Sequence, residues 1–255
     1  SSSSAASDVY KRQTCGGSTT VADRRIRCHK TTGHGTQTFT QTVMNSCNPA
    51  FIEWGRRVGV DNFYTYIDKL GLTSKTGIDI AGEAGTIIHK KENVGEVELA
   101  TMSFGQSFQI TPMQMLRAAA AIVNGGNLVT PHFAIRTCAA DKTTYSEFSY
   151  STTQEAVSKE TSDTMKDILR QVVEEGGGKN AYIEGFSIGG KTATSQKLPR
   201  GSGKYIASFI GFSDVTDPSV IAMCLIDEPQ GVYYGGTIAA PVIRELYDNI
   251  LPYMD

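Results

Sequence analysis

The sequence predicts an α+β fold, in which helical stretches come first and an antiparallel sheet follows late in the chain. Three consecutive strand-like runs, 184–195, 205–214 and 219–226, are separated by short turns. The turn between the first two, 198–204, is rich in Gly, Pro and Lys. A helical pattern at 238–251 closes the chain. Because runs joined by short turns pair antiparallel, we expect a sheet with the final helix on one face.

The N-terminal part divides into a leader and a hairpin. Residues 1–13 begin with a serine-rich tract and carry no recognisable pattern, so we expect a foreign or disordered leader there. Residues 14–30 look like a β-hairpin with its turn at 21–24. The folded domain is therefore expected to occupy 14–255.

Two helices are expected between residues 49 and 70. Pro49 suits the first position of a helix. The inward face expected for this helix consists of Phe51, Trp54 and Val58. The second run, 61–70, is amphipathic and is stopped by a glycine. Its inward face is expected to hold Phe63, Tyr66, Ile67 and Leu70.

Two further helices precede the predicted sheet. Thr111 is a good N-cap and Pro112 a good first residue for a helix that runs to about Val123 and is apolar on nearly all sides. Such a helix belongs in the middle of a domain. A run at 159–175 has an amphipathic pattern and ends at three consecutive glycines.

Composition excludes some classes of function. The net charge is −2, which argues against a nucleic-acid partner held by a basic patch. No run of about 18 apolar residues is present, so nothing in the sequence is expected to span a membrane.

The cysteines and histidines allow more than one interpretation. Cys28, His29 and His34 could form a zinc group with Cys15, but their spacing fits no standard module. Free or disulfide-bonded thiols are favoured over a metal, with a cross-strand disulfide between Cys15 and Cys28 as one option. We therefore expect no metal. The other two cysteines considered, Cys47 and Cys224, are expected to be small buried residues.

Two short motifs carry the chemistry. The stretch 189–195, Gly-Gly-Lys-Thr-Ala-Thr-Ser, lies on the first predicted strand of the sheet. Alone, Lys191 would be a charged residue that protects an edge strand. Far upstream is Ser46-Cys47-Asn48. A literal Lys-Thr-Gly at 75–77 is expected to be coincidental, because it follows a helix stop and does not lead into a hairpin.

These motifs, in this order, resemble the penicillin-binding proteins and serine β-lactamases, whose motifs are Ser-x-x-Lys, Ser-x-Asn and Lys-Thr/Ser-Gly. The segments 76–83, 111–115, 207–212 and 234–241 extend the resemblance to the transpeptidase domain of a class B penicillin-binding protein of the division or sporulation type. It covers about 14–253. It implies a β-lactamase/transpeptidase-like fold: an antiparallel sheet flanked by helices, plus a mostly helical subdomain.

The resemblance also implies roles for single residues. Ser46 matches the serine that relays a proton toward the leaving amine, and Asn48 the residue that hydrogen-bonds the substrate amide. Asn48 could also cap the helix that follows. Lys191 matches the cation that orients the serine hydroxyl, and Thr192 the hydroxyl that holds the substrate carboxylate. The backbone N–H of Thr194 matches an oxyanion donor.

The sequence departs from the family pattern in two places. Ala193 replaces the commoner glycine at a position where substrate lies against the strand. No serine in the chain has a lysine three residues on. We therefore expect a partial transpeptidase domain, without the first strands and the nucleophile helix, and inactive by itself.

The function implied is peptidoglycan D,D-transpeptidation by serine acyl transfer at the extracytoplasmic face of the bacterial membrane, with an N-terminal anchor outside this chain. Expected partners are stem peptides, β-lactam antibiotics and a cell-wall glycosyltransferase, with no cofactor and no nucleic acid. The alternatives are a D,D-carboxypeptidase or β-lactamase, and a β-lactam-sensing or structural pseudoenzyme. The four histidines have no serine or cysteine partner motif, so we expect them to be structural.

Overall fold

The computed structural model describes residues 12–199 and 201–254. Its centre is a three-stranded antiparallel sheet in the order β11-β10-β9, as expected. Its strands are β9 (Ile188–Gln196), β10 (Tyr205–Ser213) and β11 (Val220–Asp227). In the register, Lys191 is opposite Ile210, near the middle of the β9–β10 pair.

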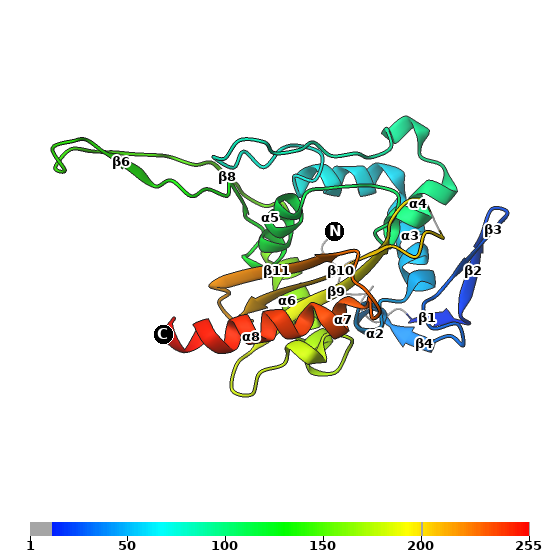
Figure 1. The fold of residues 1–255 in the computed structure, drawn as a ribbon. Helices are drawn as coiled ribbons and strands as arrows, with labels where there is room; N and C mark the ends of the chain where they lie inside the picture. Colours follow the sequence, from blue (N-terminus) through cyan, green and yellow to red (C-terminus); the bar gives the residue numbers. More distant parts are fainter. Residues whose placement is uncertain (1–11, 200, 255) are drawn as a thin grey trace.

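One helix covers a face of this sheet. Figure 1 shows α8 (Ala240–Ile250) along the sheet, after the short α7 (Gly235–Ile238). The main hydrophobic core lies between them, with Phe209, Ile243 and Tyr247 at most 2% exposed. Three apolar side chains buried at one interface fix α8 against β10 and so stabilise the sheet that carries Lys191.

The remaining helices lie on the other side and edge of the sheet, and three of them cover stretches where helices were expected. Helix α6 packs against β9, and α5 contacts both α6 and β11. The helices of this part are α2 (Phe39–Met44), α3 (Asn48–Lys69), α4 (Glu96–Ser103), α5 (Pro112–Val123) and α6 (Lys159–Glu174). Short 3-10 helices are η1 (Lys91–Asn93), η2 (Lys179–Ala181) and η3 (Leu251–Tyr253).

Helix α3 combines the two helices expected at 49–70, with a kink at Gly59, whose φ of 73° breaks the helical conformation. Two of the inward residues were wrong. Val58 is 41% exposed and Tyr66 50% exposed, whereas the neighbouring Ile52 and Tyr64 are buried. Spacing alone identified the helices correctly, but the side that faces the core depends on neighbours that are distant in sequence.

The N-terminal strands form two small ribbons. The predicted hairpin is present as β2 (Ser18–Val21) and β3 (Arg24–Arg27). Strand β1 (Arg12–Cys15) pairs with β4 (Gly35–Thr38). Arg12 and Gln13 therefore belong to a strand, which corrects the expected boundary of the leader by two residues. The rest of that leader, 1–11, lies outside the described residues.

A thin arm extends from the body at the end opposite the N-terminal ribbons (Figure 1). Its two small ladders pair β5 with β8 and β6 with β7. The strands are β5 (Leu128–Val129), β6 (Arg136–Cys138), β7 (Tyr145–Glu147) and β8 (Thr152–Thr153). Within the described part of the chain, no helix is long and apolar enough to cross a bilayer.

Candidate functional site

Ser46 and Lys191, 145 residues apart, meet at the edge of the sheet. The Lys191 Nζ donates a hydrogen bond to the Ser46 Oγ and a second one, of 2.9 Å, to the Thr192 carbonyl oxygen. Ser46 lies in the short connection between α2 and α3 with φ of 47°, a left-handed conformation that is uncommon for serine. Such a conformation is maintained only when its surroundings hold it. The structure thus presents the serine hydroxyl directly to a cation.

The protonation of Lys191 is set by its surroundings. Burial lowers the pKa of its ammonium group from the usual 10.5 to about 8, because the charged form loses solvation. The neutral amine is therefore accessible just above neutral pH. A lysine in this state can both donate a proton to the Ser46 hydroxyl and take one back, which a proton relay requires.

Asn48 is the first residue of α3 and does not cap it. Cys47 occupies the N-cap position, without a side-chain capping bond. The Asn48 Nδ2 instead donates to the carbonyl oxygen of Arg27, at 3.1 Å. The capping role considered for Asn48 is therefore wrong, and its amide connects the Ser46 loop to the β2–β3 hairpin.

Residues 192–194 of the strand motif are partly or fully exposed and lie beside the short helix α7. Ala193 and Thr194 are exposed, and Thr192 is half-buried. The Thr194 Oγ1 accepts a hydrogen bond of 3.1 Å from the Gly235 N–H, at the start of α7. The exposed part of β9 is therefore accessible to a ligand and anchored by α7.

Two glycines, Gly177 and Gly236, lie close to Thr192, and the motif analysis did not identify them as part of the site. A Cβ on Gly236 would lie 2.5 Å from the Gly177 carbonyl oxygen and 3.2 Å from the Thr192 methyl. A Cβ on Gly235 would lie 2.4 Å from the Ala193 carbonyl oxygen. Side chains larger than hydrogen cannot fit there without moving backbone. The sequence signal was the paired glycines before the last helix, which were used only for the family resemblance.

A second residue missed by sequence analysis is Gln106. Its Nε2 donates to the Ser195 Oγ at 3.3 Å, across 89 residues. Gln106 follows α4, so this contact joins the helical part to the end of β9. No local pattern around Gln106 indicates this role.

The Lys-Thr-Gly at 75–77 lies in a loop and not in a strand. The N–H groups of Thr76 and Gly77 donate to the Glu83 carboxylate at 2.8 and 3.3 Å. Lys75 is exposed. This segment is held by its own loop, as expected for a match without the catalytic role.

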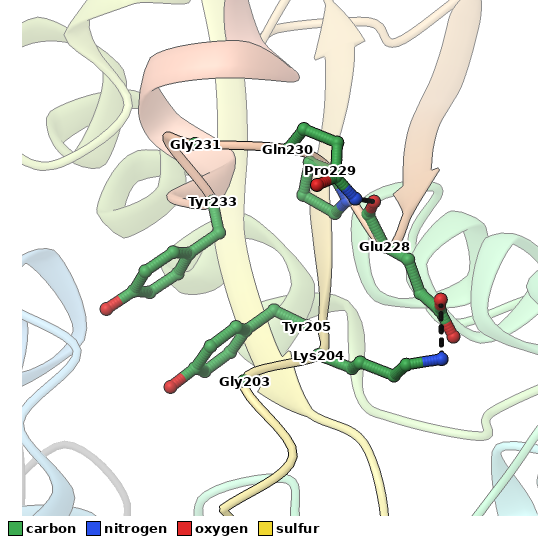
Figure 2. Close-up of a pocket in the computed structure, with 8 residues that line it drawn as sticks. All are labelled: Gly203, Lys204, Tyr205, Glu228, Pro229, Gln230, Gly231 and Tyr233. Atoms are coloured by element: carbon green, nitrogen blue, oxygen red, sulfur yellow. Dashed lines mark hydrogen bonds and ion pairs between the residues drawn. The ribbon is translucent and has the colours of Figure 1, made fainter.

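A hollow lies farther along the sheet. Figure 2 shows Tyr205 and Tyr233 stacked at its side, with ring centroids 4.0 Å apart. On the other side, the Lys204 Nζ lies 3.0 Å from the Glu228 carboxylate. The hollow has a volume of about 420 Å³ and does not include Ser46 or Lys191. Tyr205 pairs with Gln196 at the end of β9, so the hollow continues the strand that carries the motif.

The cysteines match expectation only in part. All five are free, so the optional Cys15–Cys28 disulfide is absent from the structure. Cys47 is fully buried as expected, but Cys224 is only half-buried. His29 does not join Cys15 and Cys28: its Nε2 donates to the Asn45 carbonyl oxygen at 2.8 Å. The side chain of Cys47 takes that place instead.

Comparisons with known proteins agree with this geometry. Residues 4–248 match the family described as "Penicillin binding protein transpeptidase domain". The chain belongs to that family. This family member is 42% identical over 237 residues to Stage V sporulation protein D of Bacillus subtilis, covering 91% of this chain and 37% of that protein. It is 30% identical over 214 residues to the Probable peptidoglycan D,D-transpeptidase PenA of Neisseria meningitidis, covering 82% and 35%.

A solved structure gives the same result for the fold. The crystal structure of penicillin binding protein 3 from Mycobacterium tuberculosis, complexed with aztreonam, has a TM-score of 0.84 and 25% identity, covering 94% of this chain and 57% of that one. The predicted β-lactamase/transpeptidase-like fold is thereby confirmed. The chain spans a little over a third of the length of the two curated relatives, 37% and 35%.

Proposed function

We propose that this domain takes part in peptidoglycan D,D-transpeptidation by serine acyl transfer. In that reaction a serine Oγ attacks the penultimate carbonyl of a D-Ala-D-Ala stem peptide. The terminal D-Ala leaves as an amine, and an acceptor amine then releases the acyl group. The observation that carries the proposal is the hydrogen bond from Lys191 to Ser46, which brings two distant motifs of the family together. Family membership supports it.

Each residue of the site has a proposed task. Ser46 passes a proton to the leaving amine, and Lys191 orients its hydroxyl and tunes its acidity. Asn48 hydrogen-bonds the substrate amide after giving up its contact with Arg27. Thr192 binds the substrate carboxylate, and the backbone N–H of Thr194 stabilises the oxyanion, a donor typically worth about 3–4 kcal/mol in the transition state.

The strand offers a place for substrate. Ala193 and Thr194 are exposed beside α7, so an extended peptide can lie along β9. The methyl group of Ala193 narrows this space compared with glycine. We propose stem peptides and β-lactams as the ligands, the extracytoplasmic face of the membrane as the place of action, and a cell-wall glycosyltransferase as a partner.

A chimaera tests the proposal. Residues 12–248 of this chain replace the matching stretch of the Bacillus subtilis relative, and the product is incubated with fluorescent penicillin and separated on a denaturing gel. We expect covalent labelling. Lys191→Ala should slow it by about 100-fold or more, the scale of a lost proton-transfer group. The matched control Lys75→Ala changes the lysine of the Lys-Thr-Gly at 75–77 and should leave the rate nearly unchanged.

The second part of this test uses the 255-residue chain by itself. It has no Ser-x-x-Lys, so we expect no covalent band with fluorescent penicillin. A band from the chain alone would show that another serine serves as nucleophile. Equal losses for Lys191→Ala and Lys75→Ala in the chimaera would contradict the assignment of the strand motif.

A further inference from the structure

Three cysteines and one histidine converge beside the Ser46 loop. They come from four segments: Cys15 ends β1, Cys28 follows β3, His34 precedes β4 and Cys47 precedes α3. Their sulfur and ring nitrogen atoms all lie within 4.8 Å of one another. Within residues 12–199 and 201–254, this is the one group of at least three histidine, cysteine or acidic side chains placed closely enough to share a metal ion.

The distances suit a tetrahedral site. Zinc binds thiolate sulfur at about 2.3 Å and imidazole nitrogen at about 2.0–2.1 Å, so a tetrahedral angle separates these two atoms by about 3.5–3.6 Å. The Cys28 Sγ and the His34 Nδ1 lie 3.6 Å apart. Three soft sulfur ligands with one imidazole favour zinc over the hard cations. Four protein ligands leave no open position, which is typical of a structural site.

Too few apolar side chains surround the three cysteines for an ordinary hydrophobic core to explain their burial. Cys15, Cys28 and Cys47 are 2%, 2% and 0% exposed, and the cluster around them adds only Ala50 and the partly buried Trp54. The two ribbons here have two strands each, and such ribbons are marginally stable in water. Three thiols cannot all pair in disulfides, so one disulfide would leave a buried thiol beside His34.

The loops are shaped to bring the ligands together. Gly17 and Gly33 both have positive φ, 92° and 83°. A Cβ on Gly17 would lie 2.0 Å from the Thr31 carbonyl oxygen, and one on Gly33 would lie 2.3 Å from the Cys15 carbonyl oxygen. The Gly17 N–H also points to the Cys15 Sγ, at 3.4 Å. Hydrogen bonds of this kind commonly orient metal ligands.

We propose that Cys15, Cys28, His34 and Cys47 bind one structural zinc ion, which fastens the catalytic Ser46 loop to the N-terminal ribbons. The proposal departs from the expectation of thiols without a metal, which considered sequence spacing alone and left Cys47 out.

The proposed zinc site is joined directly to the Ser46 loop, because its ligand Cys47 is the middle residue of Ser46-Cys47-Asn48. The segment that contains Cys28 contacts the same loop twice more. The Asn48 amide donates to the Arg27 carbonyl oxygen, and the His29 Nε2 donates to the Asn45 carbonyl oxygen. A metal bound to Cys28 and Cys47 would hold these two segments together and support the left-handed backbone of Ser46, whose hydroxyl contacts Lys191.

Metal content is the first test. The 255-residue chain is purified with a reductant and without chelator, and its zinc is measured by inductively coupled plasma mass spectrometry. We expect about one zinc per chain. Cys15→Ser, Cys28→Ser and Cys47→Ser should each lower the occupancy or affinity by about tenfold or more. Cys224→Ser and His29→Ala are the matched controls, since these residues lie outside the group, and they should keep the metal.

A spectrum of the unmodified chain avoids the risk that variants misfold. The reduced, metal-free chain is titrated with Co²⁺ under anaerobic conditions. A tetrahedral site with three thiolates gives intense sulfur-to-cobalt charge-transfer bands and strong visible d–d bands, and added zinc should abolish both. A weak octahedral spectrum, or failure of the reduced chain to bind Zn²⁺ and Co²⁺, would overturn the proposal.

Hydrogen exchange tests the connection to the catalytic loop. The N–H groups of Ser46 and Cys47 donate to the carbonyl oxygens of Val43 and Thr42, at 3.2 and 3.1 Å, so their exchange reports on the loop. Removing zinc should speed exchange in the peptide that contains them, while the helix α8 should be unchanged. Unchanged exchange in the loop on loss of a bound metal would show that the ion does not support Ser46.

Discussion

Lys191 is the residue whose environment makes the sharpest prediction. Its pKa is lowered by burial, so the folded state disfavours the ammonium form. Below about pH 8 both the folded and the unfolded chain hold the proton, and folding includes the cost of burying a charge. Between pH 8 and the usual 10.5 the unfolded chain binds more protons, so the free energy of unfolding contributed by Lys191 rises with pH.

We therefore expect stability to increase by about 2 kcal/mol from pH 7.5 to 9.5, at about 1.4 kcal/mol for each pH unit above pH 8. Urea unfolding followed by circular dichroism measures this change. Lys191→Met keeps the length and apolar stem of the side chain and should remove the increase. An equal rise in that variant would assign the effect to other groups.

At the scale of one helix, Gln114 determines how α5 is joined to the loop before it. This side chain is 0% exposed. Its Oε1 accepts from the Thr111 N–H at 2.8 Å and completes the cap of α5. Its Nε2 donates to the Ser74 carbonyl oxygen at 2.7 Å and to the Thr86 Oγ1 at 2.8 Å. One amide therefore connects the loop that contains the Lys-Thr-Gly at 75–77 to a helix.

Gln114→Ala should lower the free energy of unfolding by about 2–3 kcal/mol, because buried polar groups would lose their partners. Met115→Ala is the control on the adjacent, 37% exposed residue, and it should cost less than about 1 kcal/mol. Chemical denaturation of both variants compares the two. Similar losses would mean that helix propensity and not the buried amide dominates.

The elements were predicted best where the local chemistry is complete. Thr111 and Pro112 fixed the start of α5, because a cap and a first-turn proline act within a few residues. The strands of the sheet were located by their turns, although β9 begins at Ile188 and not at 184. Side-chain faces were less predictable: Tyr66 is exposed although its spacing is helical, since packing partners decide burial.

Some contacts of the candidate site could be predicted from the sequence and others could not. Ser46 and Lys191 could be paired in advance because their motifs resemble a known family, and the structure brings them together. Their roles in the reaction stay predictions. The group around Cys47 could not be paired, because its four members come from separate segments whose spacing depends on how two ribbons fold. Likewise, no local pattern connects Gln106 to Ser195.

For the whole molecule, the edge strand β11 is the part of the sheet most open to association with a second chain. In the described part of the chain β11 pairs only with β10, and none of its residues is fully buried. Leu225 is 41% exposed on it. An apolar strand with an unpaired edge is a template for association. We expect the isolated chain, even with zinc and reductant present, to associate through this edge.

Leu225→Lys should reduce that association, because a charge on an edge strand opposes pairing with a second strand. Leu246→Lys is the matched control: this residue is also 41% exposed but lies on α8, away from the strand edge. Light scattering after size exclusion measures the oligomer, and near-ultraviolet circular dichroism during a thermal melt measures fixed aromatic packing. A monomer with a strong aromatic signal and one sharp transition would contradict the prediction and show that the three-stranded sheet is covered well enough to fold alone.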